Sequence, residues 1–417
     1  MDNPARAGIL KAMEHDTDIL IIGGGLNGPI LALAAARAGL ASTVIDALPD
    51  ATRAEDGFNG KSYALALASV RLLRNLGVWD RVAENAQPML DIKVSDGRAG
   101  EGPSPFFLHF DHAEIEEGPM GHMLEDRFLR RALIEAMREA PEITEVSGET
   151  VVSQEVDRTG VTVTLASGRA LRGRLLIGAD GRASGTAARA GIRRTGWRYG
   201  QTALVAAIEH DLPHHGVAHQ FFMPTGPLAI LPLPGNVSSI VWSETDQTAA
   251  RFAALSDADF IEVLRPRFGD FLGDIGLRGK RYTYPLSLSI ANSFIADRLA
   301  LIGDAAHGVH PVAGQGLNAG LRDVAALAQV LQEAAQRGED IAAATVLERY
   351  QQWRRFDTTT LAMATDMTNR LFSNDNPLLR VARDLGMGAI GHMPALRRGF
   401  IREAAGLTGD LPALMKA

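Results

Sequence analysis

Residues 17–28 read TDILIIGGGLNG, and this stretch decides the fold of the chain. Its apolar run ILII is typical of a strand buried on both faces. Glycines stand at positions 23, 25 and 28, and the helix-prone segment LALAAARAG (31–39) follows them. A second short strand, TVID, then ends at Asp46. A strand, a glycine turn, a helix and an acid-terminated strand form the context in which G-x-G-x-x-G binds a dinucleotide.

Each position of this motif has an expected role. Gly23 allows the tight turn, Gly25 lets a pyrophosphate approach the backbone, and Gly28 lets the helix pack closely on the strand. The first N–H groups of the helix favour the phosphate charge. Asp46 is expected to accept hydrogen bonds from an adenosine ribose and to repel a 2′-phosphate. The alternative interpretation is a glycine-rich turn that binds nothing.

Composition narrows the class of protein. The chain has 417 residues, 46% of them hydrophobic, a net charge of -7 and no cysteine. The negative charge argues against nucleic acid as a partner, and the missing cysteine excludes disulfides, a thiol nucleophile and iron–sulfur clusters. A second G-x-G-x-x-G at 386–391 follows VARDL rather than a buried strand. We therefore expect a loop or helix break there, and a single dinucleotide domain.

The rest of the chain divides into helical and strand-rich parts. Apolar spacing predicts helices over 61–82 and 123–139, and a hairpin over 151–178 that returns to a buried strand. Short apolar runs separated by Pro and Gly turns fill 198–290, with one helix expected over 257–268. This pattern indicates an antiparallel sheet inserted into the nucleotide-binding domain. RLALIGD (298–304) predicts a return to a buried strand.

The segment after that strand reads GDAAHGVHPVAGQGLNAGLRDV (303–324). Asp304 stands where open α/β sheets bind ligands and could accept hydrogen bonds from a ribityl chain. Gly314, Gly316 and Gly320 leave room for a flat ring against the backbone. A helix starting near Leu317 would point its N–H groups at the N1–C2=O edge of a flavin. The segment therefore predicts FAD; the alternative is a tight packing turn.

Several stretches resemble one family. HPVAGQGLNAGLRD (310–323), GGGLNG (23–28), GADGRAS (178–184) and GPLAILPLP (226–234) are similar to the flavin hydroxylases of ubiquinone biosynthesis, which are class A, FAD-dependent aromatic monooxygenases. The resemblance implies an α/β fold: a Rossmann-like FAD-binding domain with an inserted antiparallel β-sheet substrate domain, as in p-hydroxybenzoate hydroxylase, and C-terminal helices. NAD(P)H is the implied co-substrate, which reduces the flavin before a C4a-hydroperoxide attacks the ring.

The resemblance also implies domain boundaries. Residues 1–16 are an N-terminal extension. The FAD-binding domain comprises 17–90, 120–195 and 291–340. The substrate-binding sheet domain comprises 91–119 and 196–290, and 341–417 form a C-terminal helical region.

Cofactor contacts are carried over position by position. Asp180 of GADG resembles the acid thought to serve FAD and NAD(P)H together. Lys61 stands where the family usually has an arginine, and Ala187 where many relatives have one, so these two contacts depart from the pattern. The expected cofactor-binding residues are Gly23, Gly25, Leu26, Asn27, Gly28, Asp46, Lys61, Arg127, Asp180, Asp304, Pro311, Gly314, Gln315, Gly316, Leu317 and Asn318.

The catalytic base is left open by the sequence. His307 and His310 are candidates, and the alternative is that they only shape the loop. No metal site is expected, because Asp304 and His307 have no further ligands around them. Trp242 is expected in the core of the inserted sheet rather than as a stacking platform.

The function implied is hydroxylation of the aromatic ring of a polyprenylated phenol by molecular oxygen. The alternatives are a hydroxylase of a soluble aromatic compound and a non-catalytic, FAD-bound subunit of a quinone-biosynthesis complex. A cytoplasmic location is expected. Residues 376–417 mix arginines with leucines and methionines, which is typical of peripheral contact with the inner membrane or, alternatively, of a helix packed on the core.

Overall fold

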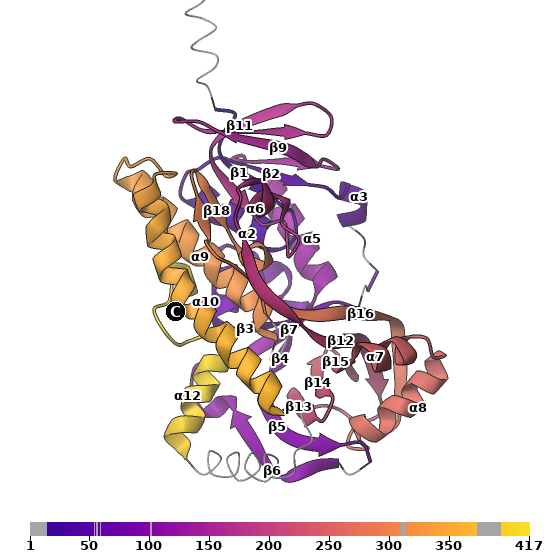
Figure 1. Cartoon of the computed structure of the whole chain (residues 1–417). Coiled ribbons are helices and arrows are strands. Elements are labelled where there is room, and N and C mark those ends of the chain that lie inside the picture. The colour runs from indigo at the N-terminus through magenta and orange to yellow at the C-terminus, as the bar shows by residue number, and fades with distance from the viewer. Residues whose placement is uncertain are drawn as a thin grey trace, which may run out of the picture.

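The protein is described here from a computed structural model, which covers residues 15–53, 55, 57–58, 60–100, 102–309, 314–372 and 393–417. Two eight-stranded sheets lie at the upper and lower ends of the molecule in Figure 1, and a three-stranded sheet lies between them. Helix α10 (Ala344–Phe372), drawn in orange, runs along one side and contacts strands of both large sheets.

The first sheet is built around the buried strand β1 (Thr17–Ile22). Its neighbours on both sides are parallel to it, so their carboxyl ends meet at one edge. Ile22 lies opposite Ile45 of one neighbour and Gly178 of the other. Helix α2 (Asn27–Arg37) begins directly after the glycine loop at that edge. The strand order is β17 (Ile295–Ala296), β18 (Leu299–Leu301), β11 (Ala170–Gly178), β1, β2 (Ser42–Asp46), β8 (Ile143–Ser147).

The second sheet is mostly antiparallel and brings together distant parts of the chain. Strands β5 (Asp91–Arg98) and β6 (Gly102–Asp111) join it through β13 (Val217–Met223), to which β5 is parallel. The other strands are β12 (Arg194–His210), β14 (Gly226–Leu233), β15 (Val237–Thr245), β16 (Ile275–Ala291) and β19 (His307–Gly308).

The two faces of this second sheet differ in side-chain size, because successive residues of a strand point to opposite faces. Leu204, Ile240 and Trp242 pack on one face with helices α7 (Asp246–Ala253) and α8 (Asp257–Phe268). Trp242 is fully buried there, which confirms the core position expected for it. Small side chains such as Ala203 and Ser239 face the opposite side, where they line a cavity.

Two of the expected helices are partly strands. Residues 61–82 contain β3 (Ser62–Ala66) before α4 (Leu67–Asn75), and 123–139 overlap β7 (Gly121–Glu125) before α5 (Asp126–Glu139). β7 pairs antiparallel with β3 and with β4 (Gln87–Met89). The helical prediction was wrong for the strand segments because their hydrogen-bond partners lie far away in the sequence. The spacing of a short Ala/Leu run suits either structure.

Other predicted elements are confirmed. The hairpin region forms β9 (Val151–Val156), β10 (Val161–Leu165) and β11, and the helix expected over 257–268 is α8. Helix α7 was missed because it starts directly after β15, where the hydroxyl of Thr245 accepts a hydrogen bond from the N–H of Thr248. Residues 1–14 of the expected extension and the second glycine motif at 386–391 lie outside the described residues.

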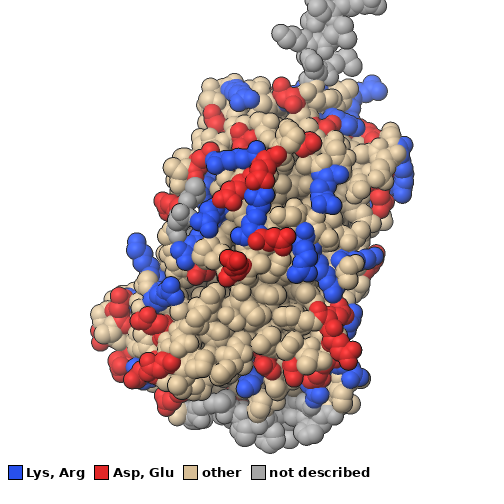
Figure 2. All heavy atoms as spheres, turned by 180° about the vertical axis from the view of Figure 1, so that it is seen from behind, with Lys and Arg blue, Asp and Glu red and all other residues tan. Residues whose placement is uncertain are grey.

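The molecular surface carries both signs of charge. On the face shown in Figure 2, Lys and Arg side chains are interspersed with Asp and Glu. Within the described part of the chain, no helix is both long and apolar enough to cross a bilayer.

Candidate cofactor and substrate site

The first glycine loop is shaped by contacts that only glycine permits. Gly23 has φ +114°, and a Cβ atom there would lie 2.3 Å from the carbonyl oxygen of Ala179. A Cβ on Gly28 would lie 2.0 Å from the carbonyl oxygen of Gly23. The loop therefore packs directly on the end of β11 and on the start of α2. This brings GADG, the second motif, beside the first.

Two other glycines border open space. A Cβ atom on Gly25 or on Gly316 would meet no other atom within 4 Å. The amide of Asn27, in the first loop, lies beside Gly303 and Gly320, and its buried oxygen has no hydrogen-bond partner in the described part of the chain. Space beside two backbone loops and an unsatisfied acceptor next to them fit a dinucleotide whose phosphates and ring approach the backbone.

Three carboxylates stand at the carboxyl edge of the first sheet. Asp46 accepts hydrogen bonds from the N–H groups of Gly24 (2.5 Å) and Leu48 (2.7 Å). Asp304 follows β18 and lies 3.1 Å from Nε of Arg182. Both side chains keep oxygen lone pairs that can accept further hydrogen bonds from ribose or ribityl hydroxyls.

Asp180, the third of these acids, is used within its own motif. Its carboxylate accepts hydrogen bonds from the hydroxyl of Ser184 (2.5 Å) and from the N–H and hydroxyl of Thr186 (both 2.9 Å). It thereby holds the start of α6 (Gly185–Arg189). Ala187, which departs from the family pattern, is buried in that helix, where its N–H donates to Ser184.

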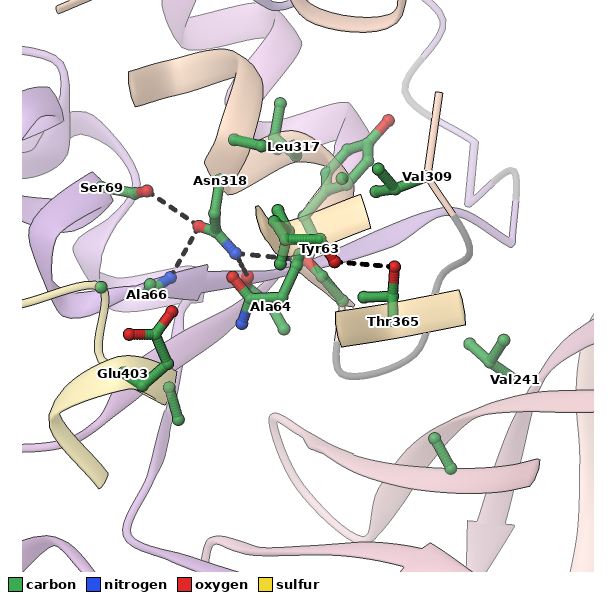
Figure 3. Close-up of a pocket in the computed structure, with 18 of the residues that line it drawn as sticks. Tyr63, Ala64, Ala66, Ser69, Val241, Val309, Leu317, Asn318, Thr365 and Glu403 are labelled. Atoms are coloured by element: carbon green, nitrogen blue, oxygen red, sulfur yellow. Dashed lines mark hydrogen bonds between the residues drawn. The ribbon is translucent and has the colours of Figure 1, made fainter. Parts of the chain in front are cut away.

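The 314–318 segment is joined to β3 by the side chain of Asn318 (Figure 3). The amide oxygen of Asn318 accepts hydrogen bonds from the N–H of Ala66 (2.9 Å) and the hydroxyl of Ser69 (2.8 Å). Its NH₂ group donates to the carbonyl oxygens of Ala64 (2.8 Å) and Gly314 (3.2 Å). The side chain is thus saturated by protein, so Asn318 can meet a cofactor only through its backbone.

The remaining expected contacts fall into two groups. Lys61, Gln315 and Leu317 line the cavity beside Gly316, at the start of α9 (Gln315–Gln336). Leu26 is buried in the core, and Arg127 pairs with Glu125 at 2.7 Å and stacks on the ring of Phe128. Pro311 and His310 lie outside the described residues.

His307 does not face the cavity. Its ring is buried, and its Nε2 atom lies 2.5 Å from the carboxylate of Asp323. Because an ionised carboxylate only accepts, Nε2 carries the proton, and the buried Nδ1 atom faces no donor among the described residues. This geometry favours the loop-shaping role for His307 over that of a general base acting on a cavity ligand.

A cavity of about 1490 Å³ joins Asp304 and the 314–318 segment to the second sheet. The wall near the loops includes Tyr63, Ala64 and the 314–318 segment. The opposite wall is apolar and is formed by the small-residue face of the sheet. Helix α10 and helix α12 (Pro394–Ala404) close one side. Cavities that hold one drug-sized ligand usually have roughly 300–1,000 Å³, so this one can take a flavin ring and a second ligand together.

Two tyrosines line the cavity that the sequence did not single out. Burial raises the pKa of Tyr63 well above its usual range, and Asp126, to which its hydroxyl donates at 3.1 Å, adds to this effect. Burial likewise raises the pKa of Tyr284. Both hydroxyls therefore stay protonated at neutral pH and are not bases. Tyr63 was hidden in a presumed helix, because β3 is a short run whose structure is set by its pairing with β7.

Comparison with known proteins agrees with this geometry. Residues 16–365 match the family described as FAD binding domain. Ubiquinone hydroxylase UbiL of Rhodospirillum rubrum is 43% identical over 100% of this chain and 96% of its own length. The 3-demethoxyubiquinol 3-hydroxylase of Escherichia coli is 34% identical, over 94% of this chain and 100% of its own.

Among solved structures, p-nitrophenol 4-monooxygenase PnpA from Pseudomonas putida has a TM-score of 0.79 at 20% identity, covering 95% of this chain and 99% of that one. The flavin-dependent monooxygenase PieE, solved with FAD and substrate, has a TM-score of 0.72 at 22% identity, over 94% of this chain and 72% of that one. At these identities the likeness shows the fold alone.

Proposed function

Because the chain belongs to the FAD-binding-domain family that includes the ubiquinone hydroxylases, we propose that it hydroxylates the aromatic ring of a polyprenylated phenol. FAD is its cofactor, NAD(P)H the co-substrate and molecular oxygen the oxidant. When bound, reduced FAD supplies the activated oxygen; the chain supplies position and a water-poor cavity. The reaction belongs to ubiquinone biosynthesis.

The observation that carries this proposal is the continuous cavity that runs from Gly316 to the small-residue face of the second sheet. The backbone of the 314–318 segment would hold the flavin ring at one end. Val205, Leu231 and Val241 offer an apolar wall at the other. Such a wall excludes water and suits an aromatic ring with an apolar tail. We propose that 91–119 and 196–290 form the substrate-binding unit, and that 17–90, 120–195 and 291–340 form the FAD-binding unit.

The hydroxylase assignment predicts the source of the new hydroxyl oxygen. Protein loaded with FAD is supplied with NADPH, a prenylphenol and isotopically labelled oxygen gas, and the product is analysed by mass spectrometry. The label should enter the ring, and NADPH oxidation should be faster with the phenol than without it. Label derived from water, or hydrogen peroxide alone with every prenylphenol tried, would contradict the assignment.

Two further outcomes of the same assay identify the alternatives. Hydroxylation of soluble phenols, with prenylphenols inert, would indicate a hydroxylase of soluble aromatic compounds. Bound FAD that NADPH and NADH never reduce would indicate a non-catalytic subunit of a quinone-biosynthesis complex. Membership of such a complex stays a prediction.

We also propose peripheral membrane contact through α12 and the adjoining part of α10. Phe400 and Phe356 line the cavity and are also 48% and 76% exposed, so they mark its mouth. Arg397 and Arg402 of α12 pair with Glu114 and Glu117. Those two arginines are thus neutralised, so the contact rests mainly on the exposed apolar side chains of α12, beside the exposed Arg398 of the same helix. Arg380 and Arg383 lie outside the described residues.

The membrane proposal predicts binding to neutral vesicles. The holoprotein should sediment with phosphatidylcholine vesicles, and the double variant L396S/F400S should lose most of this binding, because both side chains are about half exposed on α12. The matched control V152S/L212S removes two apolar side chains of similar exposure elsewhere and should bind like the parent. Equal binding by L396S/F400S and the parent would exclude this surface.

A further inference from the structure

Asp323 is a fully buried carboxylate behind the cofactor loop, and it does not line the cavity. It lies on α9 and accepts hydrogen bonds from three donors. These are the N–H of Gly303 (2.9 Å), Nε2 of His307 (2.5 Å) and Nε of Arg354 (2.8 Å). The first two donors flank Asp304, and the third belongs to α10. One side chain therefore joins three separate elements of the fold.

The charge state of this cluster is set by its own members. Burial alone would raise the pKa of Asp323, but His307 and Arg354 outweigh it and hold the pKa below its usual value. The carboxylate is therefore ionised, and Arg354, only 2% exposed, compensates its charge. A buried ion pair is weak evidence for stability in itself, because both groups lose their hydration.

The segment from Gly303 to His307 is held by hydrogen bonds on two sides. Asp323 binds the N–H of Gly303 and the His307 ring on one side. On the other, the guanidinium of Arg194 donates to the carbonyl oxygens of Asp304 (3.1 Å) and Ala305. Asp304, the acid expected to meet the ribityl chain, sits between these anchors. Its position consequently depends on Asp323, His307 and Arg194, none of which lines the cavity.

Helix α10 connects this cluster to the substrate side of the cavity. Arg354 also binds Asp357 at 2.8 Å, and both residues border the cavity. One to three turns further along the helix, Thr360, Leu361 and Ala364 line the same cavity. Helix α10, which contributes to the cavity wall, is thus hydrogen-bonded through the carboxylate of Asp323 to the segment that carries Asp304.

We propose that Asp323, His307 and Arg354 form a positioning lock that holds residues 303–307 in the conformation that receives FAD and ties them to α10. The lock rests on the chain being an FAD protein, but not on the identity of the phenol. Asp323 and His307 do not line the cavity and act on the cofactor only through Asp304 and its backbone, whereas Arg354 borders the cavity and holds Asp323 from α10.

The lock is tested by FAD affinity. Apoprotein is prepared from the parent and from D323N, R354M and R354K, and FAD is titrated while its fluorescence is followed, at a temperature at which near-UV circular dichroism shows each variant folded. D323N and R354M should raise the Kd for FAD at least tenfold. R354K should fall between R354M and the parent, since lysine keeps the charge but not the planar fork.

The matched control is R349M. Arg349 lies on the same helix and pairs with Glu339 at 2.6 Å, away from the loop. It should lose an ion pair and keep the Kd of the parent. If D323N does not fold, H307Q replaces it, because that change leaves the Asp323–Arg354 pair intact; it should still weaken FAD binding.

Two results would overturn the lock. One is a folded D323N or H307Q protein with the FAD affinity of the parent; the other is R349M weakening FAD binding as much as R354M does. A double variant D323N/R354M whose Kd is raised by no more than either single change would show that the two act as one unit. Failure of the hydroxylation assay would leave these affinities unaffected, so the two proposals are tested separately.

Discussion

Gly316→Val is expected to abolish FAD binding while the apoprotein remains folded. A Cβ atom at this position meets no protein atom within 4 Å, so the fold has room for the branched side chain. That room is the cavity beside the start of α9, where the flavin ring is expected to lie. The two methyl groups would occupy the space of the ring and keep it from the first N–H groups of the helix.

The measurement is the flavin content of the purified protein, released by denaturation and read by absorbance. The parent should be yellow and release FAD, and G316V should be colourless, with the circular dichroism spectrum of the parent apoprotein. Gly399→Val is the control, since Gly399 is also a helical glycine whose Cβ would meet nothing within 4 Å, and it lies on α12. Parental flavin content in G316V would remove this loop from the cofactor site.

Two substitutions in the first glycine loop should have different effects: one should lower the stability of the apoprotein, and the other should weaken FAD binding. Gly28→Ala puts a Cβ atom 2.0 Å from the carbonyl oxygen of Gly23, and that oxygen is backbone and cannot turn away. Helix α2 would have to move off β1. Overpacking usually costs about 1–3 kcal/mol, and a backbone clash this close should reach or exceed the upper value. We expect the free energy of unfolding of apo G28A to fall by about 3 kcal/mol or more.

Gly25→Ala is the matched variant, because the added Cβ meets no atom within 4 Å. Its apoprotein should keep the free energy of unfolding of the parent to within about 0.5 kcal/mol. Its Kd for FAD should nevertheless rise at least tenfold, about 1.4 kcal/mol, because the methyl group stands where the pyrophosphate approaches. Urea unfolding of both apoproteins and FAD titration of G25A test this contrast. Equal midpoints for G28A and the parent would refute it.

Much of the fold could be predicted from local patterns. Three features follow from the periods at which side chains point to the same side of a strand or helix. They are the buried run before Gly23, the alternation between 198 and 290 and the apolar stripe of α9. Leu321, Val324, Ala328 and Leu331, which share one face of that helix, are all buried, as expected.

The strands hidden in presumed helices could not be predicted in this way. β3 exists because β7, a strand far along the chain, supplies its hydrogen bonds: Ser62 lies opposite Glu125 and Ala66 opposite Gly121. The same holds for β5, which is parallel to β13 in the second sheet. A short run with no strong period takes the structure that its distant partner offers.

The sequence by itself determined the glycine loops and the cofactor class. The glycines of G-x-G-x-x-G and the acid that ends the second strand are close together along the chain, so their spacing can be read without knowing the tertiary structure. Only the tertiary structure decided how the other side chains are used. It turned His307 toward Asp323 and away from the cavity, and saturated the amide of Asn318 with protein partners. It also made the cavity itself, by setting the small side chains of one sheet face opposite the flavin loop. Each of these outcomes depends on groups far apart in the chain, which only packing brings within hydrogen-bond or van der Waals distance.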